Sequence, residues 1–527
     1  MLSEDVSKVK RIILLLVCFV CTLCQTVSAA SKGTILYVPM DNRPVCLDYT
    51  VQTMQAAGWD VKVPPRNIIA SAQTSGDTEK MFEWLEKNMP ESIAVVASSD
   101  ALIYGGLVGS RTHHIPLDIL KERAQRIIDL KKKYGRKMIY VFTTIMRSPK
   151  MSSAPVEPDY YEQWGSAIFR LGALEDKLEA KEIKPREIKE LAQLRSSIPQ
   201  DILEDMYTRR ENNIKATELL LHGIESGDFD YLLIGRDDTA EFSQAHREAR
   251  ELDILVRELP KEKIRFFAGA DQLGMLLLSR ASVRLQYTLP FVNLVYAPGA
   301  GENTVPSYED DTVGFSAKQH IYAAGAIPVD NHKTADLTLV LNTPYDGKTV
   351  EASNAVNNYQ QTNEVNALLL SIEEMLANGR PLAVADIKYG NGADNALVRG
   401  LFQNELAYKL QAYSGWNTAG NSLGFALAQG LLHPMYKLEA KNTLLDVRYL
   451  DDWAYQANVR MKVYQQLIWP NYWPNSGYNE AQSNKIEQTI TEDIGKLATP
   501  VMGTRVNEYQ FTLPWNRMFE VYVAKNK

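Results

Sequence analysis

Short apolar runs recur along the chain, and each of them ends in polar residues or glycine. A run of this length, bounded by turn residues, is typical of a buried strand. Amphipathic stretches such as 117–134 lie between many of these runs and predict helices. Strands that alternate with helices at this spacing indicate an α/β fold with a mostly parallel sheet. The predicted strands cover residues 34–40, 60–64, 93–97, 137–144, 231–235, 264–269, 291–296, 326–330, 337–342, 382–387 and 410–413.

The number of predicted strands exceeds the eight that a simple (β/α) barrel needs. Our first expectation is a barrel-like (β/α) core over residues 30–435, and the alternative is two doubly wound lobes that face each other. A charged helical stretch at about 155–225 is longer than one crossover helix needs, so we expect an inserted helical hairpin there. The pattern changes after this core and predicts a helical C-terminal region over residues 436–527.

The first 29 residues have the pattern of a secretory signal peptide. Lys8, Lys10 and Arg11 precede an apolar run at 12–24, and small residues before Ala30 suit cleavage. The run is short for a membrane helix, so we expect no stable span after cleavage, with an uncleaved anchor as the alternative. The protein is therefore expected to be secreted or extracytoplasmic. Beyond this segment the sequence has a single cysteine, which excludes an internal disulfide there.

The composition is that of an ordinary globular chain, with 45% hydrophobic and 23% charged residues. The net charge of -7 gives no basic footprint for a nucleic acid. The glycines at 105–106 are not followed by the lysine of a P-loop, and no GxSxG elbow occurs. We therefore expect no cofactor and no nucleic-acid partner, whereas the sequence leaves the oligomeric state open.

The segment 231–239 carries the strongest candidate for chemistry, because its apolar run ends in two adjacent aspartates, Asp237 and Asp238. In α/β folds, ligand sites lie at the carboxyl ends of such strands. Crowded carboxylates raise the pKa of at least one member, and glycoside hydrolysis uses such a pair. We expect Asp237 and Asp238 to be catalytic, with Asp238 as the acid. The alternative is a loop whose first aspartate caps the next helix.

Several other predicted strands also end in polar or aromatic residues, and we expect these side chains to converge with the aspartate pair. Acids can move protons, amides can bind hydroxyl groups, and aromatic faces can stack on a sugar ring. Arginine can bind a carboxylate or phosphate through two parallel hydrogen bonds. The candidate substrate-binding residues are Asp41, Arg43, Asp100, Tyr104, Arg147, Asp271, Asp386, Tyr413, Trp416, Asn417 and Asn421.

The same polar segments carry a resemblance to a known family. They are residues 39–44, 99–106, 235–239, 269–272, 386–391 and 415–421, in this order. Over nearly the whole mature chain, the sequence resembles the bacterial domain-of-unknown-function family numbered 4127. The resemblance implies that these segments belong together, and it implies no particular activity. A weaker likeness, carried by Asp237 and Asp238 alone, is to barrel glycosidases that use two adjacent carboxylates on N-acetylated sugars.

Taken together, the residues favour an exported hydrolase that acts on a carbohydrate, and more specifically a glycosidase with a glycan or small-molecule substrate. One alternative is a metal-dependent hydrolase in which Asp41, Asp100, Asp237 and Asp271 bind a hard cation through oxygen. With only 7 histidines and no HExxH spacing, our expectation is no metal site. The other alternative is a non-catalytic extracytoplasmic protein that binds a sugar.

Overall fold

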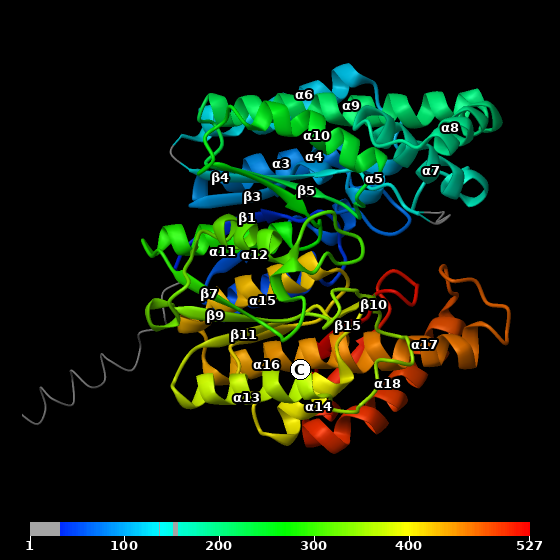
Figure 1. Ribbon diagram of the computed structural model, residues 1–527. Coiled ribbons are helices and arrows are strands. Elements are labelled where there is room, and N and C mark those ends of the chain that lie inside the picture. The colour runs from blue at the N-terminus through cyan, green and yellow to red at the C-terminus, as the bar shows by residue number, and fades with distance from the viewer. Residues whose placement is uncertain (1–31, 136, 151–155, 527) are drawn as a thin grey trace, which may run out of the picture.

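Two parallel β-sheets organise the chain (Figure 1). The computed structural model describes residues 32–135, 137–150 and 156–526, so the predicted signal peptide lies outside the described part. The first sheet has six strands in the order β2-β1-β3-β4-β5-β6. The second has five strands in the order β13-β11-β9-β7-β8. The α/β class and the mostly parallel sheets predicted from the sequence are confirmed.

The strand bounds follow the predicted apolar runs closely. The first sheet contains β1 (Thr34–Val38), β2 (Asp60–Lys62), β3 (Ala94–Ser98), β4 (Met138–Ile145), β5 (Tyr231–Arg236) and β6 (Ile264–Ala268). The second sheet contains β7 (Phe291–Tyr296), β8 (Ile327–Pro328), β9 (Leu337–Asn342), β11 (Leu382–Asp386) and β13 (Ala412–Ser414). Every residue of β3 and of β5 is buried. Central strands of a parallel sheet are covered on both faces, which explains their continuous apolar sequences.

Of the two architectures that the sequence left open, the described residues form two doubly wound lobes rather than a barrel-like core. In each sheet the first strand lies between the second and the third, the order of a doubly wound fold. The helix α11 (Leu273–Leu285) explains why the second sheet starts separately. It is buried on nearly all sides, as a helix between two layers must be. The chain therefore passes through the middle of the molecule before β7 begins.

Helices cover the sheets in three layers (Figure 1). The outer layer on the first sheet holds α3 (Thr78–Asn88), α4 (Ser99–Tyr104), α6 (Leu117–Tyr134), α9 (Gln200–Glu225) and α10 (Gln244–Val256). The layer between the sheets holds α2 (Asp48–Ala56), α11, α12 (Val313–Ala323) and α15 (Ala419–Leu431). The outer side of the second sheet carries α13 (Asn363–Ala377), α14 (Asn395–Gln403) and α16 (Leu438–Arg448).

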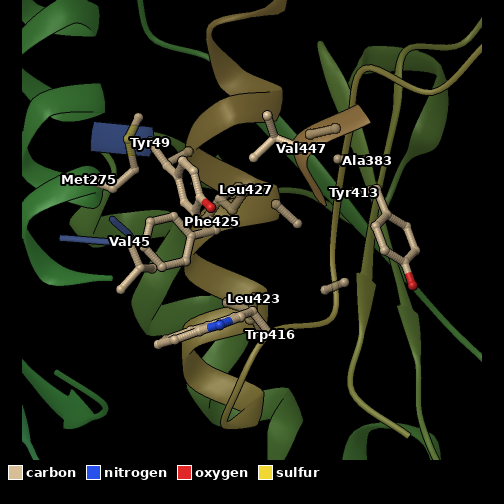
Figure 2. Close-up of a cluster of buried hydrophobic side chains, with 14 of the residues drawn as sticks. Val45, Tyr49, Met275, Ala383, Tyr413, Trp416, Leu423, Phe425, Leu427 and Val447 are labelled. Atoms are coloured by element: carbon tan, nitrogen blue, oxygen red, sulfur yellow. The ribbon is translucent and has the colours of Figure 1, made fainter. Parts of the chain in front are cut away.

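One continuous core joins the two lobes. Figure 2 shows side chains of the first lobe, such as Tyr49 and Met275, beside Phe425 and Leu427 of α15. On its other side, α15 packs against β11, β9 and β13 of the second sheet. All thirteen residues of α15, 419–431, are buried. The lobes are thus held together by a shared apolar layer rather than by a flexible linker.

Two further parts of the chain complete the fold. The predicted insertion contains α7 (Tyr161–Glu179), α8 (Pro185–Ser197) and the first half of α9, which share a small core of their own. The short helix α5 (Leu107–Thr112) lies beside it. The C-terminal region contains π-helical turns (Tyr449–Val459, Tyr464–Ile468), α17 (Arg460–Val463), α18 (Glu480–Met502) and the antiparallel strands β14 (Tyr509–Thr512) and β15 (Tyr522–Lys525). Among the described residues, no helix is both long and apolar enough to cross a membrane.

Candidate active site between the lobes

Polar ends of the first sheet meet loops of the second lobe around a cavity of about 280 Å³. The carboxyl ends of parallel strands share one edge of a sheet, which places the loops after β1, β4, β5 and β6 together. The loop before α15 and a C-terminal loop close the other side. The lining includes Arg43, Arg111, Arg147, Asp237, Asp238, Asp271, Tyr308, Asn417, Thr418, Asn421, Trp515, Arg517 and Phe519.

Arg43 ties the loop after β1 to the loop after β6. Its Nη2 lies 2.8 Å from Asp41 Oδ2 and 2.5 Å from Asp271 Oδ1, and all three side chains are buried. Burial raises the pKa of Asp271, and the positive charge of Arg43 opposes that rise. The ring of Trp515 stacks on the guanidinium at 5.4 Å. These contacts therefore join the loops after β1 and β6 to the C-terminal loop, and together they form one wall of the cavity. We call Arg43 with its two partners, Asp41 and Asp271, the Arg43 clamp.

Asp237 and Asp238 both reach the cavity, and they differ in their surroundings. Asp237 Oδ2 accepts a hydrogen bond from Arg111 Nη2 at 2.5 Å, and its side chain is 9% exposed. Asp238 Oδ2 lies 3.0 Å from Arg147 Nη1, and its side chain is 28% exposed. Burial raises the pKa of Asp238, and the charge of Asp237 raises it further. Glu157 lies behind the pair, where its Oε1 accepts a hydrogen bond from Arg147 Nε at 2.6 Å.

A tight turn brings both carboxylates of the pair to the same side. Successive residues of a strand point to opposite faces, so β5 must end before the pair, and it ends at Arg236. Asp238 adopts a left-handed φ of 37°, a conformation that aspartate tolerates better than most residues. Arg236 forms an ion pair with Asp310 at 2.6 Å, and Thr239 N donates to Tyr308 O at 3.1 Å. These bonds hold the turn against the loop that follows β7.

The second lobe contributes amide groups and a buried acid. Asn417 Nδ2 donates to Asp271 Oδ2 at 3.4 Å, and Asn421 lines the cavity nearby. Beneath them, Glu309 Oε1 accepts a hydrogen bond from Gly420 N at 2.5 Å. Burial raises the pKa of Glu309 to about 8. Within the described part of the chain, Oδ1 of Asn421 and Oε2 of Glu309 are buried without a hydrogen-bond partner.

Besides Asp41, three of the predicted site residues lie near the cavity without lining it. Asp100 is fully buried and accepts hydrogen bonds from Thr144 N and Oγ1 at 3.0 and 2.9 Å. Burial raises the pKa of Asp100 to about 7, and the charge of Asp237 adds to the rise. Tyr104 is buried and stacks on a histidine ring rather than facing the cavity. Trp416 is buried behind Phe519, with 6.2 Å between the ring centres.

Two other predicted residues, Asp386 and Tyr413, belong to a separate buried cluster at the strand ends of the second sheet. Tyr413 Oη donates to Asp386 Oδ2 at 2.7 Å, and Asn342 Nδ2 donates to Asp386 Oδ1 at 2.8 Å. The backbone N–H of Asp394 also donates to Asp386, at 2.7 Å. Burial raises the pKa of Asp386 to about 6, and the charge of Asp394 adds to it. Neither predicted residue lines the cavity between the lobes.

The cavity also contains residues that were not predicted as candidates: Arg111, Glu157 behind the lining, Tyr308, Trp515, Arg517 and Phe519. Arg111 follows the Gly105–Gly106 turn, and an arginine among small and apolar residues was a usable signal. Trp515 and Arg517 stack on each other at 4.6 Å, and Arg517 also pairs with a glutamate of the same loop. These aromatic and basic residues are evident in the sequence. Their contact with the cavity could not be predicted, because they lie far along the chain from the aspartates.

The carboxylates of the cavity are engaged by arginines rather than arranged around a common centre. Arg43 neutralises Asp41 and Asp271, and Arg111 neutralises Asp237. Across residues 32–135, 137–150 and 156–526, no group of three or more histidine, cysteine, aspartate or glutamate side chains is placed to hold a metal ion. The residues present therefore fit a hard cation poorly, because Asp41, Asp237 and Asp271 each already face an arginine.

Comparison with known proteins gives one family. Searches of curated proteins and of solved structures returned no match. A family model matches residues 35–524, which contain both lobes and nearly the whole C-terminal region. The chain therefore belongs to the family described as "Protein of unknown function (DUF4127)".

Proposed function

We propose that the protein is a hydrolase acting on a carbohydrate, specifically a glycosidase that uses Asp237 and Asp238. The observation that carries the proposal is the unequal pairing of these two adjacent carboxylates at one cavity. Asp237 is buried against Arg111, whereas Asp238 is more exposed and has a raised pKa. An acid with a raised pKa beside a second carboxylate that is paired with an arginine is an arrangement suited to acid catalysis.

The roles follow from these surroundings. Protonated Asp238 would give its proton to the oxygen of the leaving group as the glycosidic C–O bond breaks. Asp237, paired with Arg111, would stabilise the positive charge that develops on the sugar ring. Water then supplies the hydroxyl group of the product, and its remaining proton returns to Asp238. Arg147, 3.0 Å from Asp238, favours the ionised form of the acid once the proton has left.

The size and lining of the cavity suit a sugar ring. A volume of about 280 Å³ is at the small end of ligand pockets, which are commonly about 300–1,000 Å³. Asn417 and Asn421 offer amide groups to hydroxyls, and Trp515 and Phe519 offer aromatic faces. This mixture of amide and aromatic surface around two acids supports a carbohydrate more than an apolar ligand.

A sugar-binding protein without turnover is the second candidate, because two lobes with a cavity between them also describe many binding proteins. Such proteins close on their ligand by a hinge. Here the apolar layer around α15 joins both sheets, which argues against a large hinge motion. The metal-dependent alternative has less support, since arginines already pair with three of the four candidate ligands and the fourth, Asp100, is buried against Thr144. Location outside the cytoplasm remains part of the proposal and rests on the leader-like pattern of residues 1–29.

The test is release of reducing sugar from a panel of glycans and aryl glycosides by the wild-type protein and by Asp238→Asn. The proposal is supported if the wild-type protein hydrolyses at least one glycan class and Asp238→Asn hydrolyses the same class much more slowly. Binding of a glycan without release by the wild-type protein would favour the sugar-binding candidate instead. Equal hydrolysis by both proteins would remove Asp238 from the mechanism.

A further inference from the structure

A second and larger hollow lies next to the candidate active site. It has a volume of about 770 Å³ and lies between the loop 70–75, helix α5 and the helical insertion. Its walls come from α5 and from the start of α9, with Tyr160 just before α7. We call this hollow the side groove.

The side groove and the cavity share a wall. Val108 of α5 lines both of them. Glu157 lines the side groove, while its carboxylate lies 2.6 Å from Arg147 Nε and 3.3 Å from Arg111 Nη1, two arginines of the cavity. A ligand that leaves the aspartate pair in this direction would pass over Val108 into the side groove. The two hollows therefore suit one elongated ligand better than two unrelated ones.

The lining of the side groove is rich in groups that bind hydroxyls. Ser71, Gln73 and Thr74 line one wall, and Thr112 lines the side groove from α5. The hydroxyl oxygens of Ser71 and Thr74 lie 2.7 Å apart, and the hydroxyl of Thr112 donates to Val108 O at 3.0 Å. Tyr160 adds an aromatic ring on the insertion side. Hydroxyl and amide groups beside an aromatic face are the mixture that recognises a polyhydroxylated chain, and an apolar ligand would make little use of this polar surface.

The charged side chains of the side groove favour some kinds of sugar over others. Asp159 and Asp201 are exposed at its surface, and Asp205 and Glu157 lie deeper. The lining guanidinium is that of Arg209, which is buried and already paired with Asp205 at 2.7 Å. Glu157 is paired with Arg111 and Arg147, so the surplus of negative charge is that of the exposed Asp159 and Asp201. This surplus repels anionic ligands and attracts cationic ones. Uronic acids and phosphorylated sugars are therefore disfavoured, and neutral or amino-bearing sugars are favoured.

We propose that the side groove binds the continuation of an oligosaccharide whose terminal unit lies at Asp237 and Asp238, and that this continuation consists of neutral or amino-bearing sugars. The proposal rests on the proposed carbohydrate hydrolysis for the role of the aspartate pair. The substrate would then be a linear chain of several sugars. Affinity should rise with chain length until the side groove is filled.

The test measures binding by titration calorimetry to the Asp238→Asn variant, so that turnover does not interfere. The probes are oligomers of glucosamine, of N-acetylglucosamine and of galacturonic acid, each from the monosaccharide to the hexasaccharide. We expect affinity to rise with length for the glucosamine and N-acetylglucosamine oligomers and to be weakest for the galacturonate oligomers. Affinity that is independent of length, preference for galacturonate, or no binding of any oligomer would overturn the proposal.

A charge variant locates the effect in the side groove. Asp159→Asn and Asp201→Asn together should weaken binding of glucosamine oligomers roughly two- to fivefold, the effect of losing exposed charge pairs, and leave the N-acetylated series nearly unchanged. Asp118→Asn is the matched control, because Asp118 and Asp201 are both exposed and both lie in the first turn of a helix. If the control and the double variant weakened binding of glucosamine oligomers equally, the oligomers would not be bound in the side groove.

The results separate this inference from the proposed function. Length-dependent binding without any hydrolysis by the wild-type protein would leave the side groove in place and remove the glycosidase. Hydrolysis of a glycan at the same rate for short and long chains would keep the glycosidase and remove the side groove. The two proposals therefore fail on different measurements.

Discussion

Asp237 and Asp238 are consecutive in the chain, yet they pair with arginines from different elements, Arg111 of α5 and Arg147 after β4. The turn at the end of β5 makes this possible, because the left-handed φ of Asp238 keeps both carboxylates on one side. Burial raises the pKa of Asp238, and the negative charge of the neighbouring Asp237 raises it further. The geometry thus gives each aspartate a separate role.

Asp237→Asn and Asp238→Asn should each lower turnover, because one removes a stabilising charge and the other a proton donor. Loss of a general acid typically costs about 10²–10⁴-fold in rate. The Asp238→Asn variant should regain part of its rate on aryl glycosides with a good leaving group, which need little protonation, and Asp237→Asn should not. Steady-state kinetics on both substrate types measures the difference. Wild-type rates in both variants would mean that the pair is structural.

Arg43→Met should strongly destabilise the protein, because it leaves Asp41 and Asp271 buried beside each other without a positive charge. Removing one partner of a buried ion pair costs about 3–5 kcal/mol. The control is Arg257→Ala, whose pair with Asp253 is exposed and should cost less than about 1 kcal/mol. Urea unfolding at neutral pH measures both changes. If Arg43→Met lowered the free energy of unfolding as little as the control does, the Arg43 clamp would not be a stabilising contact.

The strands could be predicted from the sequence because burial on both faces leaves a continuous apolar run. The run at 93–97 became β3 (Ala94–Ser98), and the run at 264–269 became β6 (Ile264–Ala268). The choice between a barrel and two lobes could not be made, since both use the same local pattern. Which strands pair is decided by long-range contacts, here by the passage of α11 between the sheets.

In the candidate site too, some contacts could be predicted from the sequence and others could not. The approach of Arg43 to Asp271 followed from the shared edge of parallel strands, although the two residues are 228 positions apart. Asp386 was grouped with them by the same rule, but it ends a strand of the other sheet and lies in a different cluster. Trp515 reaches the cavity from the C-terminal loop, and no rule about strand ends predicts that contact.

Tyr413→Phe should lower stability without affecting glycan binding. The hydroxyl of Tyr413 donates to buried Asp386, and losing a hydrogen bond to a buried acid costs about 1–3 kcal/mol. Asn417→Gly is the contrasting variant. It removes an amide that lines the cavity, while glycine tolerates the left-handed φ of 60° at this position. We expect calorimetric glycan titration to detect only Asn417→Gly, and a binding defect in Tyr413→Phe would place the Asp386 cluster in the site.

Exhaustive dialysis against a chelator should leave both the melting temperature and glycan turnover unchanged. Of the four candidate oxygen ligands, Asp100 is buried against Thr144. The other three, Asp41, Asp271 and Asp237, already face Arg43 or Arg111, so a cation would have to displace a guanidinium. A ligand bound to the folded state raises its stability, and its removal lowers the melting temperature. Elemental analysis of the purified protein and thermal melts before and after dialysis provide the measurement. A stoichiometric divalent ion whose loss lowers the melting temperature would revive the metal-dependent alternative.

Glu309 should make the protein less stable as the pH rises. Burial raises the pKa of Glu309 to about 8 in the folded state, from a usual value of 4.5. The folded state holds the proton more tightly, so its contribution to stability is full below pH 4.5 and is lost as the pH rises through about 8. Glu309→Gln keeps the acceptor for Gly420 N and cannot ionise. Relative to the wild type, its free energy of unfolding should gain up to about 1.4 kcal/mol per pH unit between about pH 5 and pH 8. Urea unfolding of both proteins across this range decides the matter, because a difference that is constant with pH would mean that Glu309 is already ionised in the folded protein.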